Sequence, residues 1–405
     1  MNNNNTTYKD SPLGKIPSDW EVKLLSELAV LISGLHLNPD DYNHAGEGLP
    51  YFTGPTDYTN EISLITKWTT KKSALANRGD ILITVKGSGV GSLHQLELKH
   101  LSIGRQIMAL RANENCSNKF IHYSLYNLEY NFKELAKGNM IPGLTRTDIL
   151  TSKVLTPPLP EQKAIAHVLG LIDSVINTNN QLIAQKELQK KWLMQNLLTG
   201  KKRLMGFGLV WENYKLEYFI EDYDEKPKDG IRYEILTSAK SGLMKQTDYY
   251  GDNRITNRED ADYNVIPPNY LTYRSRSDDG LFTFNKNTLG FIGLISGYYP
   301  VFTINNNGDL NFILMFCNFY RDKFKKYCIG TSQLVLSMNA YKSANFSIPE
   351  REEQTAIAKV LQAADKEIQL LKAKTEKLRE QKKGLMQVLL TGKKRLTISN
   401  RCCFK

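Results

Sequence analysis

Basic, amide and hydroxyl side chains gather in the turns of two stretches of this 405-residue sequence, and their chemistry suits contact with nucleic acid. Arginine and lysine donate to guanine and phosphate, while asparagine and glutamine suit adenine. For any single residue, a solvated loop charge is the alternative. The candidates are Lys86, Ser88, Arg105, Asn139 and Arg146 in the first stretch and Lys240, Lys245, Arg254, Tyr273, Arg274, Arg276 and Gln333 in the second.

The composition favours a globular protein with a polyanionic partner. Lys and Arg exceed Asp and Glu by 53 to 42, which gives a formal net charge of +11. The chain has no apolar run of about eighteen residues that could span a membrane, and no signal peptide precedes "YKD". Its five cysteines form no CxxC motif. We therefore expect a cytoplasmic protein without disulfides or structural zinc.

Catalytic and cofactor motifs are missing from the sequence. The stretch "GSGVG" at Gly87–Gly91 follows a predicted strand, but no acidic residue lies about 20 positions later to complete a dinucleotide site. No "GxxxxGK" phosphate loop occurs, and the six histidines form no cluster with carboxylates or cysteines. We predict no catalytic site, no metal site and no cofactor bound by this chain.

The sequence contains an internal repeat of about 190 residues. With a shift of 192 positions, Glu161–Leu204 aligns with Glu353–Leu396 without a gap, and 23 of 44 positions are identical. The octapeptide "LLTGKKRL" occurs in both copies. Between Leu25 and Lys119, by contrast, almost nothing aligns with the second copy. Each copy therefore has a divergent body and a nearly constant tail.

The constant tails are predicted to be helices that begin near Glu161 and Glu353 and end at Gly200 and Gly392. Glycine provides a left-handed cap there, and the following Lys-Lys-Arg opposes the negative end of the helix dipole. Apolar residues recur at three-then-four spacing, which is typical of a coiled-coil seam. The predicted seam consists of Ile176, Ile183, Leu193 and Leu197 in the first copy and Ile368, Leu371, Leu378, Leu385 and Leu389 in the second.

Polar residues interrupt this seam, so a lone helix would be unstable without a matching partner. The interruptions are Asn179, Lys186, Lys190, Thr375 and Lys382. Because the obvious match is the other copy, we predict that the two helices pack antiparallel. The segment from Asp173 to Leu197 would span about 36 Å at a rise of 1.5 Å per residue, close to one turn of B-DNA.

The divergent bodies are predicted to be mixed α/β domains, each with an open or barrel-like sheet. Strand patterns occur within Gly79–Leu93 and Pro267–Phe284, and helices over residues 119–138 and 311–330 close the two bodies. We expect residues 1–157 and 205–348 to form two recognition domains, residues 158–204 and 349–396 to form the joining helices, and residues 397–405 to be a disordered tail.

A family resemblance is carried by the tails and openings of both repeats. These are the tails "PPLPEQKAIAHVLGLIDSVI" and "IPEREEQTAIAKVLQAADKEI", the two "LLTGKKRL" ends, and the openings "GKIPSDWEVKLL" and "GLVWENYKL". With the strand "GDILITVKGS", they resemble the DNA specificity (S) subunit of type I restriction-modification systems. The resemblance implies two target-recognition domains joined by an antiparallel pair of helices. Each domain would read one half of a bipartite double-stranded DNA target.

The same resemblance implies that the chain is non-catalytic and works through partners. It would bind two methyltransferase (M) subunits that use S-adenosylmethionine, and through them restriction (R) subunits that use ATP and Mg²⁺. A stand-alone modifying enzyme is disfavoured by the missing motifs. A coiled-coil adaptor with two protein-binding heads is the alternative, and DNA binding would separate it from a specificity subunit.

Overall fold

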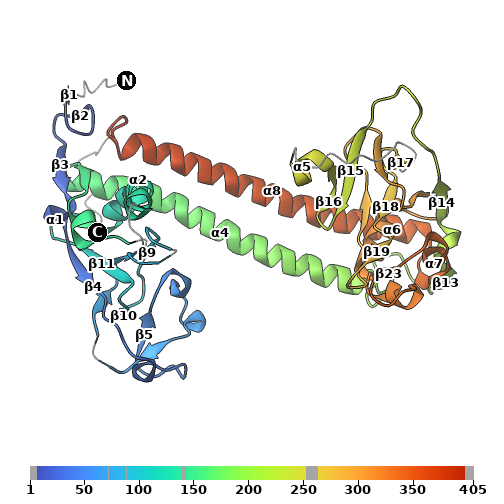
Figure 1. Cartoon of the computed structure of the whole chain (residues 1–405), viewed down its shortest axis with the longest axis horizontal. Coiled ribbons are helices and arrows are strands. Elements are labelled where there is room, and N and C mark those ends of the chain that lie inside the picture. Colours follow the sequence, from blue (N-terminus) through green and yellow to red (C-terminus); the bar gives the residue numbers. More distant parts are fainter. Residues whose placement is uncertain (1–6, 72, 88, 138–142, 252–262, 397–405) are drawn as a thin grey trace. The chain divides into compact units, whose positions relative to one another are not determined.

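The computed structural model describes residues 7–71, 73–87, 89–137, 143–251 and 263–396 (Figure 1). The chain folds into two units. The first contains the residues up to Asn180 together with those from Lys374 onward, and the second contains Gln181–Ala373. Each unit therefore combines the body of one repeat with segments of both constant helices. The predicted disordered tail, residues 397–405, lies outside the described residues.

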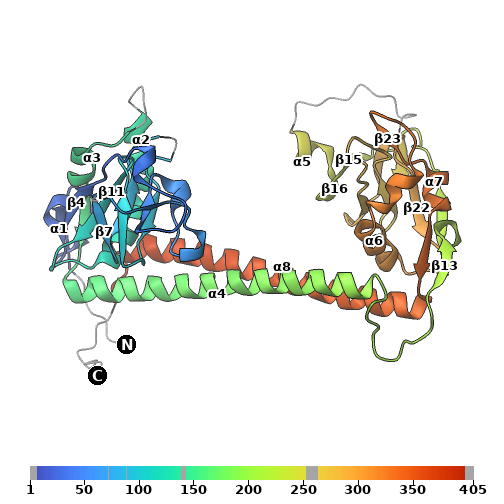
Figure 2. The same ribbon diagram turned by 90° about the horizontal axis from the view of Figure 1, so that it is seen from below.

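The two constant helices are α4 (Leu159–Leu197) and α8 (Arg351–Leu389), each of 39 residues. Within each unit their segments lie side by side and run in opposite directions (Figures 1 and 2). The antiparallel packing predicted from the seam is confirmed. The helix start predicted near Glu161 is close to the observed start at Leu159, and the 39 residues of α4 span about 58 Å, of which Asp173–Leu197 is only a part.

Charged pairs cross from one helix to the other at equivalent positions of the two repeats. In the first unit, Lys382 Nζ lies 2.7 Å from an oxygen of Asp173. In the second, Lys190 Nζ lies 2.5 Å from Asp365, which is the same pair shifted by 192 positions. The lysines that interrupt the apolar seam are therefore matched by carboxylates on the partner helix.

The predicted apolar seam residues are buried or half-buried between α4 and α8 or at their ends. The buried ones are Ile176, Ile183, Leu197, Ile368 and Leu389, and the half-buried ones are Leu193, Leu371, Leu378 and Leu385. Two polar seam residues, Asn179 and Thr375, are buried as well. Apolar burial at these positions supplies the main driving force for the pairing.

The first turn of each constant helix is tied to the adjoining body by a glutamine. Gln162 Nε2 donates to the carbonyl of Pro157, 2.9 Å away, and its Oε1 accepts from the backbone N–H of Ser117 at 3.0 Å. Gln354 makes the equivalent two bonds in the second unit. Both side chains are buried, so these bonds fix where the helix leaves the body.

Helices α4 and α8 end at Leu197 and Leu389, and the predicted capping glycines follow three residues later in the left-handed region. The φ angle is +68° at Gly200 and +71° at Gly392. A side chain at Gly392 would also collide with Pro17, since its Cβ would lie 2.5 Å from that ring. The two leucines before each cap, Leu197–Leu198 and Leu389–Leu390, are buried in the apolar core of a body. The octapeptide is therefore a helix terminator and a core segment at once.

The arginine of each octapeptide binds the buried glutamate at the start of the other helix. Arg395 donates through Nε and Nη2 to the two oxygens of Glu161, at 2.6 Å each. Trp20 Nε1 also donates to Glu161, at 3.1 Å. In the second unit Arg203 and Trp211 bind Glu353 in the same way. We call these two groups the arginine–glutamate latches, because each joins one repeat to the other.

The latches add a second role to the Lys-Lys-Arg triplet, which the sequence predicted to oppose the dipole at the end of its own helix. Arg395 binds Asp19 as well as Glu161, and both carboxylate oxygens of Asp19 lie 2.8 Å from the Arg395 guanidinium. This arginine lowers the pKa of Asp19 below its ordinary value, and its own pKa is raised by the same carboxylates. The neighbouring Lys393 and Lys394 are exposed.

In the residues that the structure describes, each body has two four-stranded sheets, where the sequence predicted one. In the first body, one sheet is antiparallel throughout, and the other contains a parallel pair, β5 with β10. The first sheet has the order β4 (Ala29–Ser33), β11 (Ile107–Ala112), β8 (Ile81–Thr84), β9 (Leu93–Gln95), and the second has the order β6 (Trp68–Thr69), β5 (Leu49–Phe52), β10 (His100–Ile103), β7 (Leu75–Asn77).

The second body repeats this topology although its sequence has diverged. Its parallel pair is β15 with β21. The antiparallel sheet has the order β14 (Ile220–Tyr223), β22 (Val301–Ile304), β18 (Leu271–Tyr273), β20 (Phe284–Lys286), and the other has the order β16 (Gly242–Lys245), β15 (Glu234–Ala239), β21 (Gly293–Ser296), β17 (Tyr263–Ile266). The repeat found in the tails therefore extends through the whole chain.

A two-stranded antiparallel ladder and the predicted closing helix complete each body. The ladder is β3 (Glu21–Leu24) with β12 (Lys153–Thr156) in the first body and β13 (Glu212–Lys215) with β24 (Asn345–Ile348) in the second. The closing helices are α2 (Asn118–Lys137) and α6 (Leu310–Phe319), the latter followed by a 3-10 turn over Lys323–Tyr327. The bodies also contain four short helices, α1 (Leu25–Leu28), α3 (Arg146–Leu150), α5 (Gln246–Tyr250) and α7 (Met338–Ser343). Two further strand pairs are β1–β2 (Tyr8–Lys9, Ile16–Pro17) and β19–β23 (Arg276–Ser277, Leu334–Val335).

Helix α2 meets α8 at a polar cluster in the first unit. Tyr123 donates its hydroxyl to Asp173 at 2.7 Å, and the ammonium of Lys382 lies over the rings of Tyr123 and Tyr126. His122 is buried beside them, and its Nδ1 has no hydrogen-bond partner in the described structure. Burial, reinforced by the charge of Lys382, lowers the pKa of His122 to about 4. The imidazole is therefore neutral at neutral pH.

The first latch can be tested with the R395A variant. The substitution leaves the buried Glu161 carboxylate without its cation, which is expected to destabilise the first unit by on the order of 3–5 kcal/mol. Urea unfolding followed by circular dichroism measures this loss. K394A is the matched control, because Lys394 is exposed and adjacent, and it should change stability by less than about 0.5 kcal/mol. Equal losses in the two variants would contradict the latch.

The buried imidazole predicts a pH dependence of stability. An unfolded histidine has a pKa of about 6.5, so between about pH 6.5 and 4 the unfolded chain binds a proton that folded His122 does not. The free energy of unfolding should therefore fall by on the order of 2 kcal/mol from about pH 7 to about pH 5. H122Q should flatten this dependence, and H167Q, at an exposed histidine of the same unit, should preserve it. Unfolding of the variants at both pH values provides the comparison.

Candidate nucleic-acid interface

Four of the predicted contact residues surround one surface depression in the second body. Two adjoining hollows of about 630 and 400 Å³ share Arg274 and Arg276 in their walls. Lys240 lines the larger hollow and Gln333 the smaller one. We call the pair the basic hollow; tyrosines and hydroxyl side chains complete it, namely Tyr249, Tyr250, Tyr298, Tyr299, Thr237, Ser238, Ser241 and Thr283.

The carboxylates of the basic hollow already have partners. Asp279 accepts from Ser277 and lies 3.7 Å from Lys240, and these bonds lower its pKa to about 2, with the Ser277 bond the largest cause. Asp278 accepts from Gln333 at 3.2 Å. The two arginines have no ion pair within the part of the chain that the structure describes. Positive charge is therefore left available to an anion.

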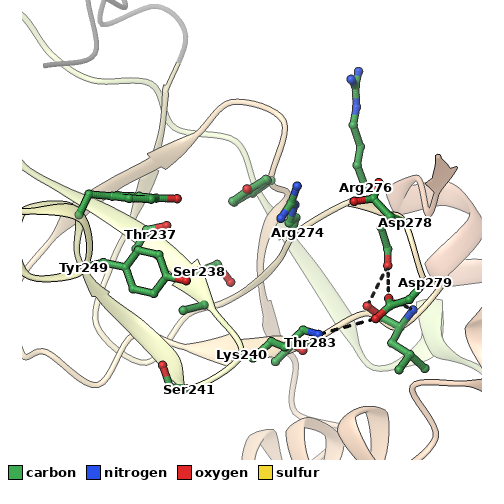
Figure 3. Close-up of a pocket in the computed structure, with 15 residues that line it drawn as sticks. Thr237, Ser238, Lys240, Ser241, Tyr249, Arg274, Arg276, Asp278, Asp279 and Thr283 are labelled. Atoms are coloured by element: carbon green, nitrogen blue, oxygen red, sulfur yellow. Dashed lines mark hydrogen bonds and ion pairs between the residues drawn. The ribbon is translucent and has the colours of Figure 1, made fainter. Parts of the chain in front are cut away.

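Arg274 and Arg276 face the solvent differently. Figure 3 shows the guanidinium of Arg274 beside the hydroxyl-bearing side chains, while Arg276 extends away from the other labelled residues. The guanidinium of Arg276 lies 4.9 Å from the ring centre of Tyr298, a cation–π contact. Among the residues that the structure describes, Arg274 makes no cation–π contact of this kind. A guanidinium in this setting can bind a phosphate or the edge of guanine.

Tyr273 was predicted to contact DNA, and the structure corrects this prediction. Its side chain has no exposed surface, and its hydroxyl donates to the carbonyl of Leu336 at 3.1 Å. Successive residues of a strand point to opposite faces, so a buried Tyr273 on β18 places the neighbouring Arg274 outward. The tyrosine is a core residue that orients the arginine.

Gln333 reaches the basic hollow because a glycine permits a tight turn before it. Gly330 has a φ angle of +109°, and a Cβ there would lie 2.2 Å from the carbonyl oxygen of Gln333. The chain then forms β23, which pairs with β19, so that Val335 faces Arg276. The turn at Gly330 therefore brings Gln333 to the wall of the hollow.

The remaining candidates of the second body lie elsewhere or outside the description. Lys245 is half-buried at the end of β16, 3.5 Å from Glu234 and 5.5 Å from the ring centre of Phe291. It lines neither part of the basic hollow, and its charge is already paired. Arg254 lies outside the described residues, as do Ser88 and Asn139 of the first body.

Three candidates of the first body lie on loops that converge at one end of its antiparallel sheet. Exposed Lys86 follows β8 and forms a β-bridge with Gly143, three residues before Arg146. Arg146 is exposed and donates to the hydroxyl of Ser33 at 2.8 Å. Arg105 is exposed and precedes Gln106. The backbone carbonyl of Gln106 accepts a hydrogen bond from the backbone N–H of Val85, which adjoins Lys86.

Tyr249, Tyr250 and Tyr298 were missed by the sequence prediction. They are exposed, which is unusual for large aromatic rings, and all three line the basic hollow. The signal was present in the doublets "YY" at positions 249–250 and 298–299, each next to a glycine or proline. Exposed rings of this kind can stack on bases or sugars.

The described residues provide neither a metal site nor a membrane span. Within the ranges that the structure covers, no three His, Cys, Asp or Glu side chains come together as ligands. None of the helices in that same part of the chain is both long and apolar enough to cross a bilayer.

The model of the type I restriction modification DNA specificity domain matches residues 17–188 and again residues 225–380. Together these segments cover most of the chain and both repeats. The chain therefore belongs to the family of type I restriction-modification specificity subunits, as the sequence resemblance predicted.

Two curated relatives come from Methanocaldococcus jannaschii. The putative type I restriction enzyme MjaX specificity subunit is 34% identical over 201 residues, which are 49% of this chain and 47% of that protein. That match spans about half of the relative. The type I restriction enzyme MjaVIII specificity subunit is 24% identical over 413 residues, with 94% of each chain covered.

Two solved structures share the fold at low sequence identity. The S subunit of a type I restriction-modification system from M. genitalium matches with a TM-score of 0.61 and 16% identity, over 98% of this chain and 99% of that one. A chain from a structure on complex assembly and conformational transition of the type I restriction-modification system gives a TM-score of 0.54 at 13% identity, over 93% and 99%. These likenesses support the fold with two bodies and two long helices.

The basic hollow predicts a measurable electrostatic contribution to DNA binding. The R274A/R276A variant should bind duplex DNA more weakly, and the slope of log K against log salt concentration should fall by about 1 for each phosphate that the variant no longer neutralises. Fluorescence anisotropy over a series of salt concentrations measures both quantities. R232A, at an exposed arginine of the same body outside the hollow, is the control. An unchanged slope in the double variant would argue against phosphate binding at this hollow.

Proposed function

We propose that this chain reads a bipartite DNA target, with one half-site assigned to each body, as the specificity subunit of a type I restriction-modification complex. The family membership carries the assignment to DNA target recognition. The two-part target is our inference from the duplication. Two bodies with the same strand order but different loop residues suit two half-sites of different sequence.

The near-identity of the two tails supports docking of two like partners. Residues of a body that read DNA are free to diverge, whereas a surface that binds one kind of subunit has to be kept in both copies. The 23 identical positions of the tails fit such a surface on α4 and α8. We propose that two methyltransferase subunits dock there and that restriction subunits join through them. S-adenosylmethionine, ATP and Mg²⁺ would enter with those partners.

The chain itself would supply no chemistry in this proposal. Its basic hollow has donors and aromatic rings for binding, but the nucleophile, acid–base pair or metal cluster of a catalytic site is not evident in the described residues. The adaptor alternative, with two protein-binding heads, would leave the basic hollow without a ligand. DNA binding by the full-length chain with its methyltransferase partner separates the two functions.

Mapping of methylated adenines tests the proposed function directly. Single-molecule sequencing of the host genome, with and without this gene, should reveal a split motif that disappears when the gene is deleted. Replacement of residues 8–156 by the corresponding body of a relative should change one half of the motif and leave the other intact. R274A should relax or abolish only the other half, because Arg274 lies in the second body.

The outcomes separate the hypotheses. A contiguous motif, or loss of both halves on replacement of one body, would contradict the assignment of one half-site to each body. Unchanged methylation after deletion of the gene would remove the role in target recognition altogether. R232A should leave the motif unchanged, since Arg232 is exposed but outside the basic hollow.

A further inference from the structure

A second kind of hollow occurs in both units, between the closing helix and the two-stranded ladder. In the first unit it has a volume of about 130 Å³, and in the second about 410 Å³. Five lining positions correspond at a shift of 192 residues. They are Ser124, Leu128, Lys153, Val154 and Leu155 in the first unit and Phe316, Tyr320, Asn345, Phe346 and Ser347 in the second.

The chain itself forms one wall of the hollow in the first unit. Leu13 lies there, at the turn between β1 and β2, which is closed by hydrogen bonds between Ser11 and Gly14. The hydroxyl of Tyr8 anchors this hairpin to the carbonyl of Gly392 at 3.2 Å. In the first unit, therefore, a peptide turn of the chain itself presents one apolar side chain, Leu13, to the hollow.

The hollow in the second unit has no such cover. The residue that corresponds to Leu13 is Met205, which is 99% exposed. The connection from α4 to β13 forms a wide loop (Figure 2), and none of its residues between Thr199 and Trp211 lines the hollow. This uncovered hollow is also the larger of the two.

Aromatic rings form the floor of the uncovered hollow: Trp211, Tyr320 and Phe346 are half-buried, and they pack with Phe316, which is buried. The rings of Phe316 and Tyr320 lie 4.7 Å apart between centres, and Phe346 lies 5.4 Å from Phe316. Trp211 borders them at the end of the ladder. These rings are packed against one another and therefore hold a preformed apolar surface, which lowers the entropic cost of binding.

Two lysines make the rim of this hollow positive. Lys323 and Lys326 are exposed, and no carboxylate pairs with either of them in the described part of the chain. The first repeat has Asn131 and Glu134 at the corresponding positions. The second hollow therefore differs from the first in two ways that favour a ligand: an open aromatic floor and an unpaired positive rim.

We propose that this aromatic hollow, lined by Trp211, Phe316, Tyr320, Phe346, Lys323 and Lys326, is a docking site for a peptide segment of a partner protein. The segment would pack an apolar side chain against the half-buried rings of Trp211, Tyr320 and Phe346 and place Asp or Glu residues beside the lysines. A polypeptide is favoured over nucleic acid because a polypeptide turn borders the equivalent hollow of the first unit. The inference does not depend on the proposed reading of DNA.

Fluorescence anisotropy with a defined peptide and the full-length chain tests the site. The probe is a fluorescein-labelled copy of Tyr8–Pro17 in which Lys9 and Lys15 are replaced by Glu. Saturable binding is expected, and K323E/K326E should weaken it about tenfold through repulsion of the acidic flanks. K99E/K119E makes the same charge change at exposed lysines of the first unit and should leave the affinity unchanged.

Two further changes address the aromatic floor. A probe with L13D should lose binding, because a carboxylate would replace the apolar anchor. Y320L/F346V installs the residues of the first unit at two floor positions and should weaken binding several-fold, with circular dichroism to verify the fold. Absence of saturable binding, or equal affinity in K323E/K326E, would overturn the proposal. Loss of random-sequence DNA binding in K323E/K326E, with peptide binding unchanged, would assign the site to nucleic acid instead.

Discussion

Two buried carboxylates, Glu161 and Glu353, constrain the whole architecture. A carboxylate without exposed surface needs a cation and hydrogen-bond donors to remain charged, and neither repeat supplies both for its own glutamate. Tryptophan comes from the same repeat, but the guanidinium comes from the octapeptide of the other, 234 residues away for Glu161. Each unit is complete only when both tails are present and antiparallel. This requirement explains why both copies of "LLTGKKRL" keep the arginine.

Constancy and divergence in the sequence correspond to different physical demands. The tails have to satisfy buried ion pairs, glycine caps and a seam at fixed register, so few substitutions are compatible. The bodies need only apolar side chains at alternating strand positions, and many residues meet that demand. The strand order is therefore identical in the two bodies although their residues do not align. Loop residues can vary even more widely than strand residues. The basic hollow and the aromatic hollow of the second body accordingly have lining residues that differ from those of the first body.

Local patterns predicted the helical part of the fold well. The caps at Gly200 and Gly392 and the antiparallel seam follow from short-range spacing and from the matching of two repeats. The split of each body into two sheets could not be predicted, because the parallel pairs, such as β5 with β10, join residues about 50 positions apart, with the strands β6 to β9 between them in the sequence. The partner of Arg395 was hidden for the same reason: nothing local identifies a glutamate at the far end of the other helix.

The basic hollow shows how a core residue determines the presentation of a binding residue. From Tyr273 to Ser277 the side chains alternate between buried and exposed, with Arg274 and Arg276 on the exposed side. Strand periodicity alone requires this once one position is fixed, and the aromatic contacts of Tyr273 with Phe284 and Tyr341 fix it. Alternation in "YRSRS" could therefore have excluded Tyr273 from the candidates and kept both arginines. The buried Tyr273 determines which face of the strand carries Arg274 and Arg276, and the surrounding loops determine what the two guanidiniums can contact.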